Sequence, residues 1–335
     1  MEASSGRAGI KARWMAHFSK SMSLVLAALT AMAAAARADT AMADLPYRIG
    51  GDGRVSTDVA VDGQGPFSFL LDTASSRTML FEHLRQRLGL APSESGTLKV
   101  YAMNNIGTAM PVKPRELRLA SQPVTGLTLG VLPDDLHPPD GVQGADGILG
   151  MDALSSYFLM MDHDTLRLKL MDPANPQTEP YRRWPSAELT PYRAKDIDVT
   201  LWWLRAKFGD QSVTALLDMG SGITMLNWNA AEKLGLRKTS FDKAPIAQSL
   251  RDALGTLEPV VTVKGLTITL ADRTFPAQTV IVANAAVFRY FGLDGKAAAI
   301  IGPALLRYNS LAIDFNKRRI YIGPTSRTAL ADAPS

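Results

Sequence analysis

The sequence predicts an all-β fold, mainly strands with short helices, arranged as two duplicated β-barrel lobes. The first observation is an internal repeat: residues 67–90, FSFLLDTASSRTMLFEHLRQRLGL, align without a gap with residues 213–236, VTALLDMGSGITMLNWNAAEKLGL. The second is the alternation of apolar and polar residues in segments such as 55–62 and 166–171, which is typical of half-buried strands. The third is that the helical pattern after each LLD is short and stops at a glycine.

The repeat continues farther along each half of the chain. An apolar–apolar–Gly segment is followed by a short helical signal and then by a strand pair with a turn, MMDHDTLRLKLM in the first half and AIDFNKRRIYIG in the second. The two apolar–apolar–Gly segments are Ile148, Leu149, Gly150 and Ile300, Ile301, Gly302. Because the same elements recur in the same order, the economical interpretation is a duplicated, two-lobed protein.

This repeat divides the chain into five parts. Residues 45–172 are the expected N-terminal lobe and residues 197–325 the expected C-terminal lobe. Residues 173–196 hold five prolines and little periodicity, which is typical of an interlobe linker. Residues 326–335 are expected to form a frayed tail, and residues 1–38 a leader.

The leader has the pattern of a signal peptide. Lys11, Arg13 and Lys20 form a basic region, residues 23–36 form an apolar core, and a small-x-small cleavage pattern ends at Ala38. An uncleaved membrane anchor is the alternative, but the apolar run is short for a span and rich in alanine. No other apolar segment approaches the length of a span, so we expect an exported protein with no stable membrane span after signal removal.

The composition limits which cell compartment and which binding partners are expected. The chain has no cysteine, which excludes disulfides and thiolate chemistry and favours a bacterial periplasm over a eukaryotic secretory route. The net charge of +4 equals that of the leader, which holds five basic residues and one acid, so the remainder is balanced. A balanced chain gives no electrostatic argument for nucleic-acid binding.

One acidic residue ends a strongly apolar strand in each repeat: Asp72 in the first and Asp218 in the second. A buried carboxylate is costly unless hydrogen bonds or a partner stabilise it. If the lobes pack about a pseudo-twofold axis, the two side chains meet, and carboxyls about 3 Å apart share a proton. The protonated carboxyl then donates to a substrate carbonyl while the ionised one takes a proton from a trapped water, which is general acid–base hydrolysis of an amide.

Residues around the two acids suit this chemistry. We expect the hydroxyls of Ser75 and Ser221 to hydrogen-bond the outer carboxylate oxygens and orient them. Gly220 permits a tight turn and a close approach of the opposing backbone. The two apolar–apolar–Gly segments are expected to pack behind the Asp loops.

The two motifs together resemble the signature of aspartic peptidases of the pepsin and retropepsin kind. That signature is hydrophobic–hydrophobic–Asp–Thr–Gly–Ser with a downstream hydrophobic–hydrophobic–Gly, and here it occurs twice. The resemblance covers roughly residues 45–325 and is greatest to bacterial exported retropepsin-like proteins with two fused lobes. It implies a bilobal fold, Asp72 and Asp218 as the catalytic dyad of an aspartic endopeptidase, and an interlobe cleft for an extended peptide or protein. Both acids lie in one chain, so dimerisation is not required.

Two departures from the signature leave a second function open. Ala74 replaces the glycine of the first loop, which is acceptable if its φ angle is negative. Met219 replaces the Thr or Ser whose hydroxyl, in the family, bonds the opposite loop, whereas Thr73 keeps that hydroxyl. The alternative function is therefore a catalytically weak or inactive protein of the cell envelope that binds peptides in its cleft.

The resemblance also implies a flap over the cleft. Residues 99–111 have strand-like flanks around an Asn-Asn turn, and Tyr101 is either a substrate-facing aromatic or ordinary sheet packing. Residues 248–259 occupy the corresponding interval of the second repeat. His83, His137 and His163 lack ligand-like spacing, so we expect no metal site and no other cofactor.

Overall fold

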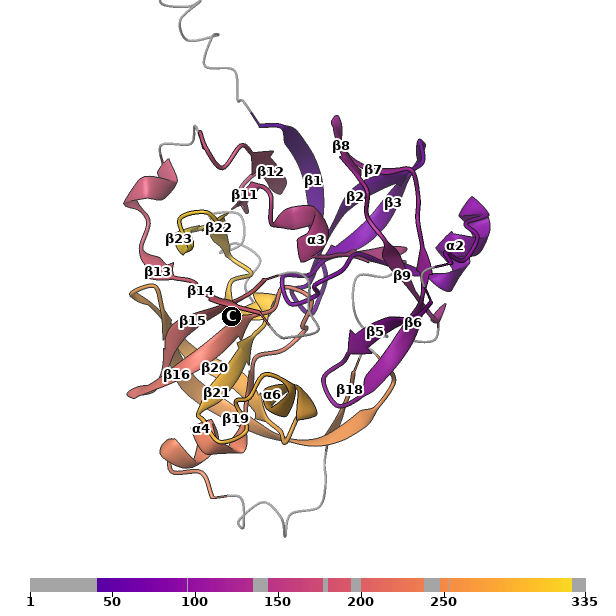
Figure 1. Cartoon of the computed structure of the whole chain (residues 1–335). Coiled ribbons are helices and arrows are strands. Elements are labelled where there is room, and N and C mark those ends of the chain that lie inside the picture. The colour runs from indigo at the N-terminus through magenta and orange to yellow at the C-terminus, as the bar shows by residue number, and fades with distance from the viewer. Residues whose placement is uncertain are drawn as a thin grey trace, which may run out of the picture. The chain divides into compact units, whose positions relative to one another are not determined.

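The computed structural model describes most of the chain from residue 41 onward (Figure 1). The described residues are 41–94, 96–134, 144–176, 180–193, 200–237, 248–252 and 254–326. The predicted leader lies outside them, as does the predicted tail except for Ser326.

Strands dominate the described residues, as the alternation predicts. The first half contributes β1 (Ala43–Ile49), β2 (Val55–Val61), β3 (Gln64–Leu71), β4 (Met79–Phe81), β5 (Leu98–Tyr101), β6 (Ile106–Val112), β7 (Glu116–Leu119), β8 (Gln122–Thr125), β9 (Leu129–Leu132), β10 (Gly147–Leu149), β11 (Phe158–Asp162) and β12 (Arg167–Met171). The rest contributes β13 (Ser186–Glu188), β14 (Thr190–Tyr192), β15 (Leu201–Phe208), β16 (Gln211–Leu217), β17 (Met225–Leu226), β18 (Gln248–Arg251), β19 (Leu257–Leu270), β20 (Arg273–Val282), β21 (Ala298–Ile301), β22 (Asn309–Asp314) and β23 (Arg319–Thr325).

These strands form two sheets in which the repeats have matching strand orders. One sheet of 15 strands contains the run β2-β3-β10-β4-β9-β6-β5, and the other, of eight strands, contains β15-β16-β21-β17-β20-β19-β18. The pairing directions also agree, since β3 with β10 and β16 with β21 are parallel, as are β4 with β9 and β17 with β20. Each repeat therefore presents its Asp loop at the end of an equivalent central strand.

The two halves share one end of the larger sheet, in the order β13-β23-β22-β11-β12-β1. The join is the antiparallel pairing of β11 with β22, where Leu159 lies opposite Ile313 and Met161 opposite Leu311. Both strands are almost wholly buried, and pairing satisfies their backbone groups. The last strand pair of each repeat thus joins the halves instead of closing a separate barrel.

The segment expected as a linker, residues 173–196, contains regular structure in its described part, which its five prolines do not predict. It contains the short 3₁₀ helix η2 (Pro180–Arg183) and strands β13 and β14. β13 pairs with β23 in the shared part of the sheet, and β14 pairs with β15. Proline is compatible with such short edge strands, because an edge strand leaves N–H positions unpaired.

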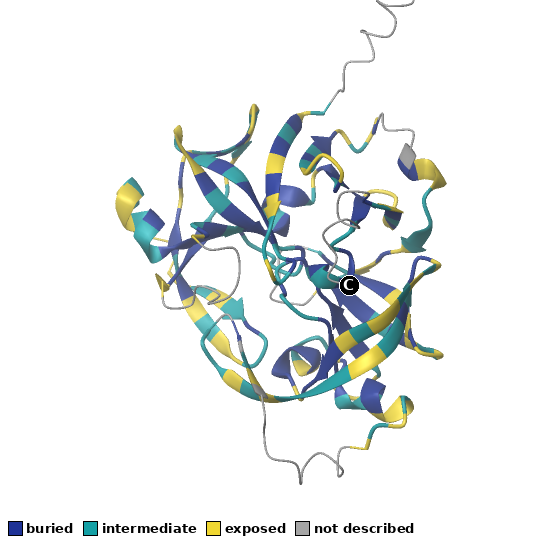
Figure 2. Ribbon diagram, turned by 180° about the vertical axis from the view of Figure 1, so that it is seen from behind, coloured by how far each residue is buried: buried dark blue, intermediate teal, exposed yellow. Residues whose placement is uncertain are grey.

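Burial alternates along the outer strands and becomes continuous in the central ones (Figure 2). Along β1 every second residue is buried, whereas all four residues of β9 and of β21 are buried. One apolar cluster draws residues from both repeats, with Leu71 and Leu217 among its members. The strand ends that carry the two acids are therefore anchored in a common core.

The helices are short, as predicted. They are α2 (Glu82–Leu88), α3 (Met151–Leu154), α4 (Trp228–Lys233), α6 (Ala286–Tyr290) and the 3₁₀ helix η3 (Pro303–Leu305). α2 ends at Gly89, which adopts the left-handed conformation with φ of 64°, and α4 begins at Asn227, whose side chain accepts a hydrogen bond from the Ala230 N–H. No helix within the described ranges is long and apolar enough to cross a lipid bilayer.

Candidate active site

Asp72 follows β3, and Asp218 follows β16, in equivalent surroundings. β3 runs parallel to β10, and the Asp72 N–H donates to the Leu149 carbonyl at 3.0 Å. β16 runs parallel to β21, and the Asp218 N–H donates to the Ile301 carbonyl at 3.0 Å. The apolar–apolar–Gly segments thus pack beside the Asp strands and tie each acid to its own sheet.

The glycine that ends each of these segments is required by close packing. A Cβ atom at Gly150 would lie 2.4 Å from the Arg77 carbonyl carbon, and one at Gly302 would lie 2.2 Å from the Ile223 carbonyl oxygen. Both contacts are with backbone atoms that cannot turn aside. Each Asp loop therefore lies directly against the Gly of its partner segment.

The two Asp loops are joined across the interface of the repeats by one hydroxyl. Thr73 Oγ1 donates to the Leu217 carbonyl at 2.7 Å and accepts from the Met219 N–H at 3.1 Å. Both Thr73 and Met219 are buried, so these bonds are shielded from water. The thioether of Met219 supplies no matching hydroxyl donor, and this hydroxyl clasp comes from the first loop alone.

The carboxyl of Asp72 reaches the second loop. A Cβ atom placed on Gly220 would lie 2.4 Å from Asp72 Oδ2, so only a glycine leaves room for this approach. Asp72 Oδ1 accepts from the N–H groups of Ala74 and Ser75 at 2.8 and 2.9 Å, and Asp218 Oδ1 accepts from the Gly220 N–H at 3.0 Å. One oxygen of each carboxyl is thus held by its own loop.

Both acids have pKa values above the usual range for a carboxyl. Desolvation by the surrounding protein raises the pKa of Asp72, and the loop N–H groups and the charge of Arg54 oppose this increase. Desolvation also raises the pKa of Asp218, and the negative charge of Asp72 raises it further. Two coupled acids of this kind titrate as a pair and share a proton over an extended pH range.

The serine hydroxyls do not contact the carboxylates, contrary to the sequence-based expectation. Ser75 Oγ donates to the Arg77 carbonyl at 2.7 Å, and Ser221 Oγ donates to the Ile223 carbonyl at 3.0 Å. In each loop the hydroxyl closes a turn two residues long, while the backbone N–H groups bind the acid. The serines therefore stabilise loop shape and not carboxylate orientation.

Ala74 is accommodated without backbone strain. It is not one of the non-glycine residues with positive φ in the described chain, and Gly220 does not have a positive φ either. The side chain of Ala74 packs against the core. The glycine that the first loop lacks is therefore not needed there for a left-handed conformation.

The hairpin of β5 and β6 corresponds to the predicted flap, and its tip docks on the second repeat. The Asn104 N–H donates to Asp252 Oδ2 at 2.9 Å, and the Met103 carbonyl accepts from the Val287 N–H of α6 at 2.7 Å. Tyr101 packs edge-on against Tyr290, with ring centroids 5.7 Å apart. Tyr101 thus makes a packing contact in this structure.

A second hairpin, of β18 and β19, holds the equivalent place in the strand order of the other repeat. Its turn contains Asp252, which is buried and accepts from the Leu254 and Thr256 N–H groups at 3.0 and 2.9 Å. The same carboxylate accepts the flap-tip N–H. The two equivalent hairpins therefore contact each other at their tips.

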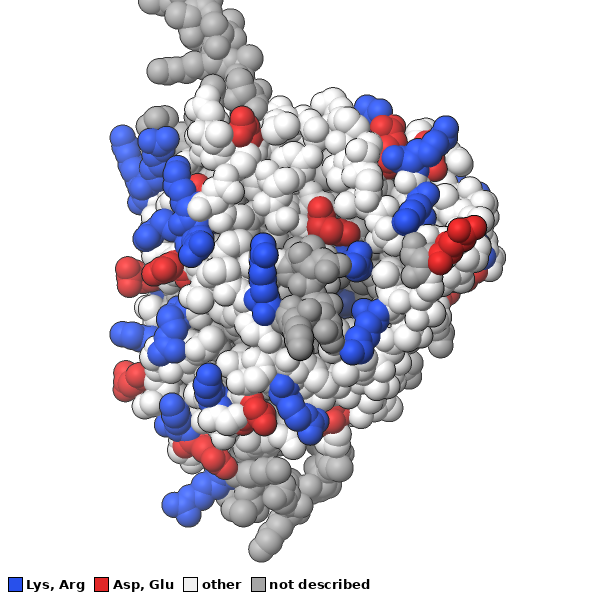
Figure 3. Space-filling view, viewed as in Figure 1, with Lys and Arg blue, Asp and Glu red and all other residues white. Residues whose placement is uncertain are grey.

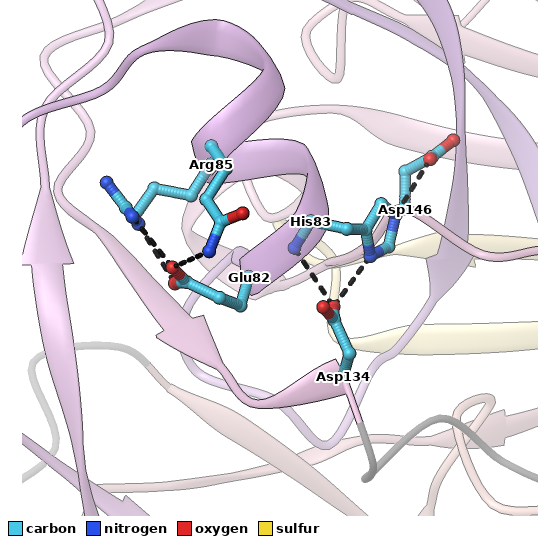
Figure 4. Close-up of polar contacts among 6 residues, drawn as sticks. Glu82, His83, Arg85, Asp134 and Asp146 are labelled. Carbon is cyan, nitrogen blue, oxygen red and sulfur yellow. Dashed lines mark hydrogen bonds and ion pairs between the residues drawn. The ribbon is translucent and has the colours of Figure 1, made fainter.

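Sequence reasoning missed a histidine held between two carboxylates (Figure 4). His83 Nδ1 lies 2.7 Å from Asp134 Oδ1, and its Nε2 lies 3.1 Å from Asp146 Oδ1. Burial alone would lower the pKa of His83, but the hydrogen bonds with both acids outweigh it and raise the pKa. The two acids contact opposite ring nitrogens, an arrangement that does not converge on one metal ion, and no metal-binding group of three occurs among the described residues.

His163, the other histidine in the described part of the chain, makes a structural contact. His163 is buried, its Nδ1 lies 2.7 Å from the Tyr47 hydroxyl, and burial lowers its pKa to about 4. His137 lies outside the described residues.

Over the face seen in Figure 3, Lys and Arg side chains are interspersed with Asp and Glu.

Comparisons with known proteins agree with this geometry. Residues 57–153 match the aspartyl protease family. Among solved structures, the aspartic proteinase from Irpex lacteus is similar, with a TM-score of 0.52 and 16% sequence identity over 87% of this chain and 99% of that one. No curated protein matches the chain. The chain therefore has the fold of a bilobal, pepsin-like aspartic proteinase, which confirms the predicted fold class and the resemblance to aspartic peptidases.

Proposed function

We propose that this chain, which has the fold of the two-lobed aspartic proteinases, is an aspartic endopeptidase with Asp72 and Asp218 as its catalytic pair. The observation that carries the proposal is that equivalent loops of the two repeats bring these acids together. Asp72 Oδ2 approaches the second loop so closely that only a glycine fits beside it, and the negative charge of Asp72 raises the pKa of Asp218. A shared proton is the property that amide hydrolysis by two carboxyls requires.

The reaction uses both protonation states of the pair at once. The ionised carboxyl removes a proton from a water molecule, whose oxygen attacks the peptide carbonyl carbon. The protonated carboxyl donates its proton to the carbonyl oxygen, which gives a neutral tetrahedral diol. Collapse of the diol breaks the C–N bond as the newly protonated carboxyl gives its proton to the leaving amine. The newly ionised carboxyl takes a proton from one diol hydroxyl as the carbonyl of the acid product forms, and the pair returns to its starting state.

An extended peptide or protein segment is the substrate that suits the site. Asp72 and Asp218 lie at the ends of strands in a β-rich surround, and the hairpin of β5 and β6 reaches from the first repeat to Asp252 of the second. An extended chain placed beneath such a hairpin can make main-chain hydrogen bonds, whatever its sequence. Because both acids belong to one chain, a dimer is not required.

Substitution of the two acids tests the proposal. Asp72→Asn and Asp218→Asn keep the size of the side chain and remove the shared proton, so each is expected to abolish cleavage of a peptide library. Asp162→Asn is the matched control, because Asp162 Oδ1 accepts from the N–H groups of Asp164 and Thr165 in a turn. Cleavage that persists in the double Asp72/Asp218 variant would refute the proposal.

A second candidate is a cleft protein that binds peptides without cleaving them. The one-sided clasp favours it, because Met219 has no hydroxyl to bond the first loop as Thr73 bonds the second. Small errors in the placement of catalytic groups cost orders of magnitude in rate. The mature protein would then bind an extended peptide but cleave none at any pH, whereas turnover sensitive to pepstatin would count against it.

The proposed location is outside the cytoplasm, in a bacterial periplasm. This proposal is supported by the pattern of the leader and the absence of cysteine. N-terminal sequencing of the mature protein and fractionation of the producing cells test it: a chain that begins near Asp39 in the exported fraction is expected.

A further inference from the structure

The turn between β1 and β2 carries an ion pair whose role the proposed mechanism leaves open. Asp52 Oδ2 pairs with Arg54 Nε at 2.5 Å, and Asp52 Oδ1 accepts from the Arg54 N–H at 3.0 Å. Each side chain is only 16% exposed. A pair so poorly exposed is little screened by salt, and its charges act over longer distances than those of a surface pair.

This turn belongs to the first repeat but packs on the second. Arg307 Nη2 donates to the Gly51 carbonyl at 2.8 Å. Gly53, with φ of 84°, lies so near the next segment that a Cβ atom would be 2.8 Å from Ala304 Cα. The turn is therefore fixed in place by the chain that follows Gly302.

The ion pair itself lies against the second Asp loop. A Cβ atom on Gly222, four residues after Asp218, would be 3.1 Å from Asp52 Oδ2 and 3.5 Å from Arg54 Nε. The equivalent residue of the first loop is Ser76, so the second loop has a glycine where the pair needs room. The guanidinium is thus brought to the loop whose hydroxyl is missing.

We propose that Arg54 is a positioning residue of the acid pair, placed by the β1–β2 turn against the second Asp loop so that its charge acts on both carboxyls. This inference rests on the proposed function of Asp72 and Asp218. Arg54 favours an ionised carboxyl at the site, and Asp52 moderates that effect by holding and partly neutralising the guanidinium.

The charges that face this group support the assignment. Asp52 is the acid of its own turn, Asp72 and Asp218 come from the two Asp loops, and Arg307 contacts the turn from the second repeat. The positive charge of Arg54 lowers the pKa of both dyad acids, against the larger increase from desolvation. Without it, the pair would hold its proton to a higher pH.

The test is the pH profile of kcat/KM in variants of opposite expected sign. Arg54→Gln removes the positive charge and is expected to move both limbs of the profile to higher pH by about half a unit or more, a loss of about threefold on the acid limb. Asp52→Asn leaves the guanidinium less neutralised, and its limbs are expected to move to lower pH. Arg54→Lys keeps the charge and is expected to keep the limbs.

Arg48→Gln is the matched control. Arg48 lies on β1 of the same hairpin and pairs with Asp58, with half of its side chain exposed. No displacement of its limbs is expected. If Arg54→Gln and Asp52→Asn both lower kcat without moving the limbs, or move them in the same direction, the turn is only structural and the inference is wrong.

A measurement without substrate separates this inference from the proposed function. Carbon-13 titration of the Asp72 and Asp218 carboxyls is expected to give pKa values that increase in Arg54→Gln and decrease in Asp52→Asn. If the wild-type protein never cleaves peptides but these displacements occur, the proposed function fails and the electrostatic role stands. If cleavage occurs and depends on the acids while the pKa values stay constant, the inference about Arg54 fails alone.

Discussion

The two Asp loops, DTASS and DMGSG, occupy equivalent places in the two repeats but contribute differently to the site. The first supplies the hydroxyl of Thr73, which bonds both to Leu217 and to the Met219 N–H. The second supplies Gly220, whose lack of a side chain admits the Asp72 carboxyl. A duplicated site thus need not be symmetric, because one hydroxyl and one gap, each from a different copy, suffice to bring the acids together.

The same division explains why each departure from the family signature is tolerated where it occurs. Ala74 replaces glycine at a residue whose φ is not positive and whose methyl group packs against the core, and Met219 replaces the hydroxyl in the loop whose backbone N–H is already held. If each departure occurred in the other loop, an alanine would place a methyl group against Asp72 and the clasp would have no hydroxyl. Substitutions of equivalent residues in the two loops therefore test this asymmetry.

The largest effect is expected from adding a methyl group at Gly220. Gly220→Ala would place Cβ 2.4 Å from Asp72 Oδ2, so the carboxyl must move, and we expect kcat/KM to fall by about a hundredfold or more. The equivalent change, Ala74→Gly, removes a methyl group that packs against the core at a residue without a positive φ, and should alter kcat/KM little. Kinetics on one peptide substrate compare the two, and equal losses would contradict the asymmetry.

A smaller effect is expected from breaking the clasp. Thr73→Val keeps the shape of the side chain but leaves the Leu217 carbonyl and the Met219 N–H without their partner, and it is expected to lower the free energy of unfolding by about 1–3 kcal/mol. Met219→Leu exchanges one buried apolar side chain for another and should cost less than about 1.5 kcal/mol. Urea denaturation measures the free energy of unfolding of both variants. A larger loss in Met219→Leu than in Thr73→Val would contradict the assignment of the clasp to Thr73.

The smallest effect concerns stability against pH. Folding raises the pKa of Asp218. At a pH above the ordinary pKa of a carboxyl, the unfolded chain is ionised at this residue. The folded protein instead keeps the proton or carries a charge that burial disfavours. The acid pair therefore lowers stability as pH rises, and Asp218→Asn removes that loss. Its Tm relative to wild type is expected to increase by a few degrees from pH 3 to pH 7.

Asp162→Asn provides the reference for this measurement, because the Asp162 side chain accepts from the N–H groups of its own turn and is not part of the acid pair. A Tm difference between Asp218→Asn and wild type that is greatest at low pH would contradict the direction of the pKa change. A constant difference would show that the substitution acts through packing and not through protonation.

Much of the fold follows from features contained within about 25 consecutive residues. The period of two along the strands, the LLD repeat and the short helices stopped at Gly89 and Gly235 are local patterns, and they predict two similar β-rich halves with an acid at each central strand end. The approach of Asp72 to the loop that follows Asp218 agrees with the repeat, because equivalent residues near a pseudo-twofold axis are expected to meet.

Contacts between segments more than a hundred residues apart were decided only by tertiary packing. The pairing of β11 with β22, the flap tip on Asp252 and the approach of Arg54 to Gly222 depend on how the halves dock, and no local pattern specifies that. The serine hydroxyls illustrate the same limit at short range, since those of Ser75 and Ser221 bond backbone carbonyls where the sequence predicted carboxylates. A sequence determines which groups are available, whereas the geometry of the docked halves determines which of the competing partners each group contacts.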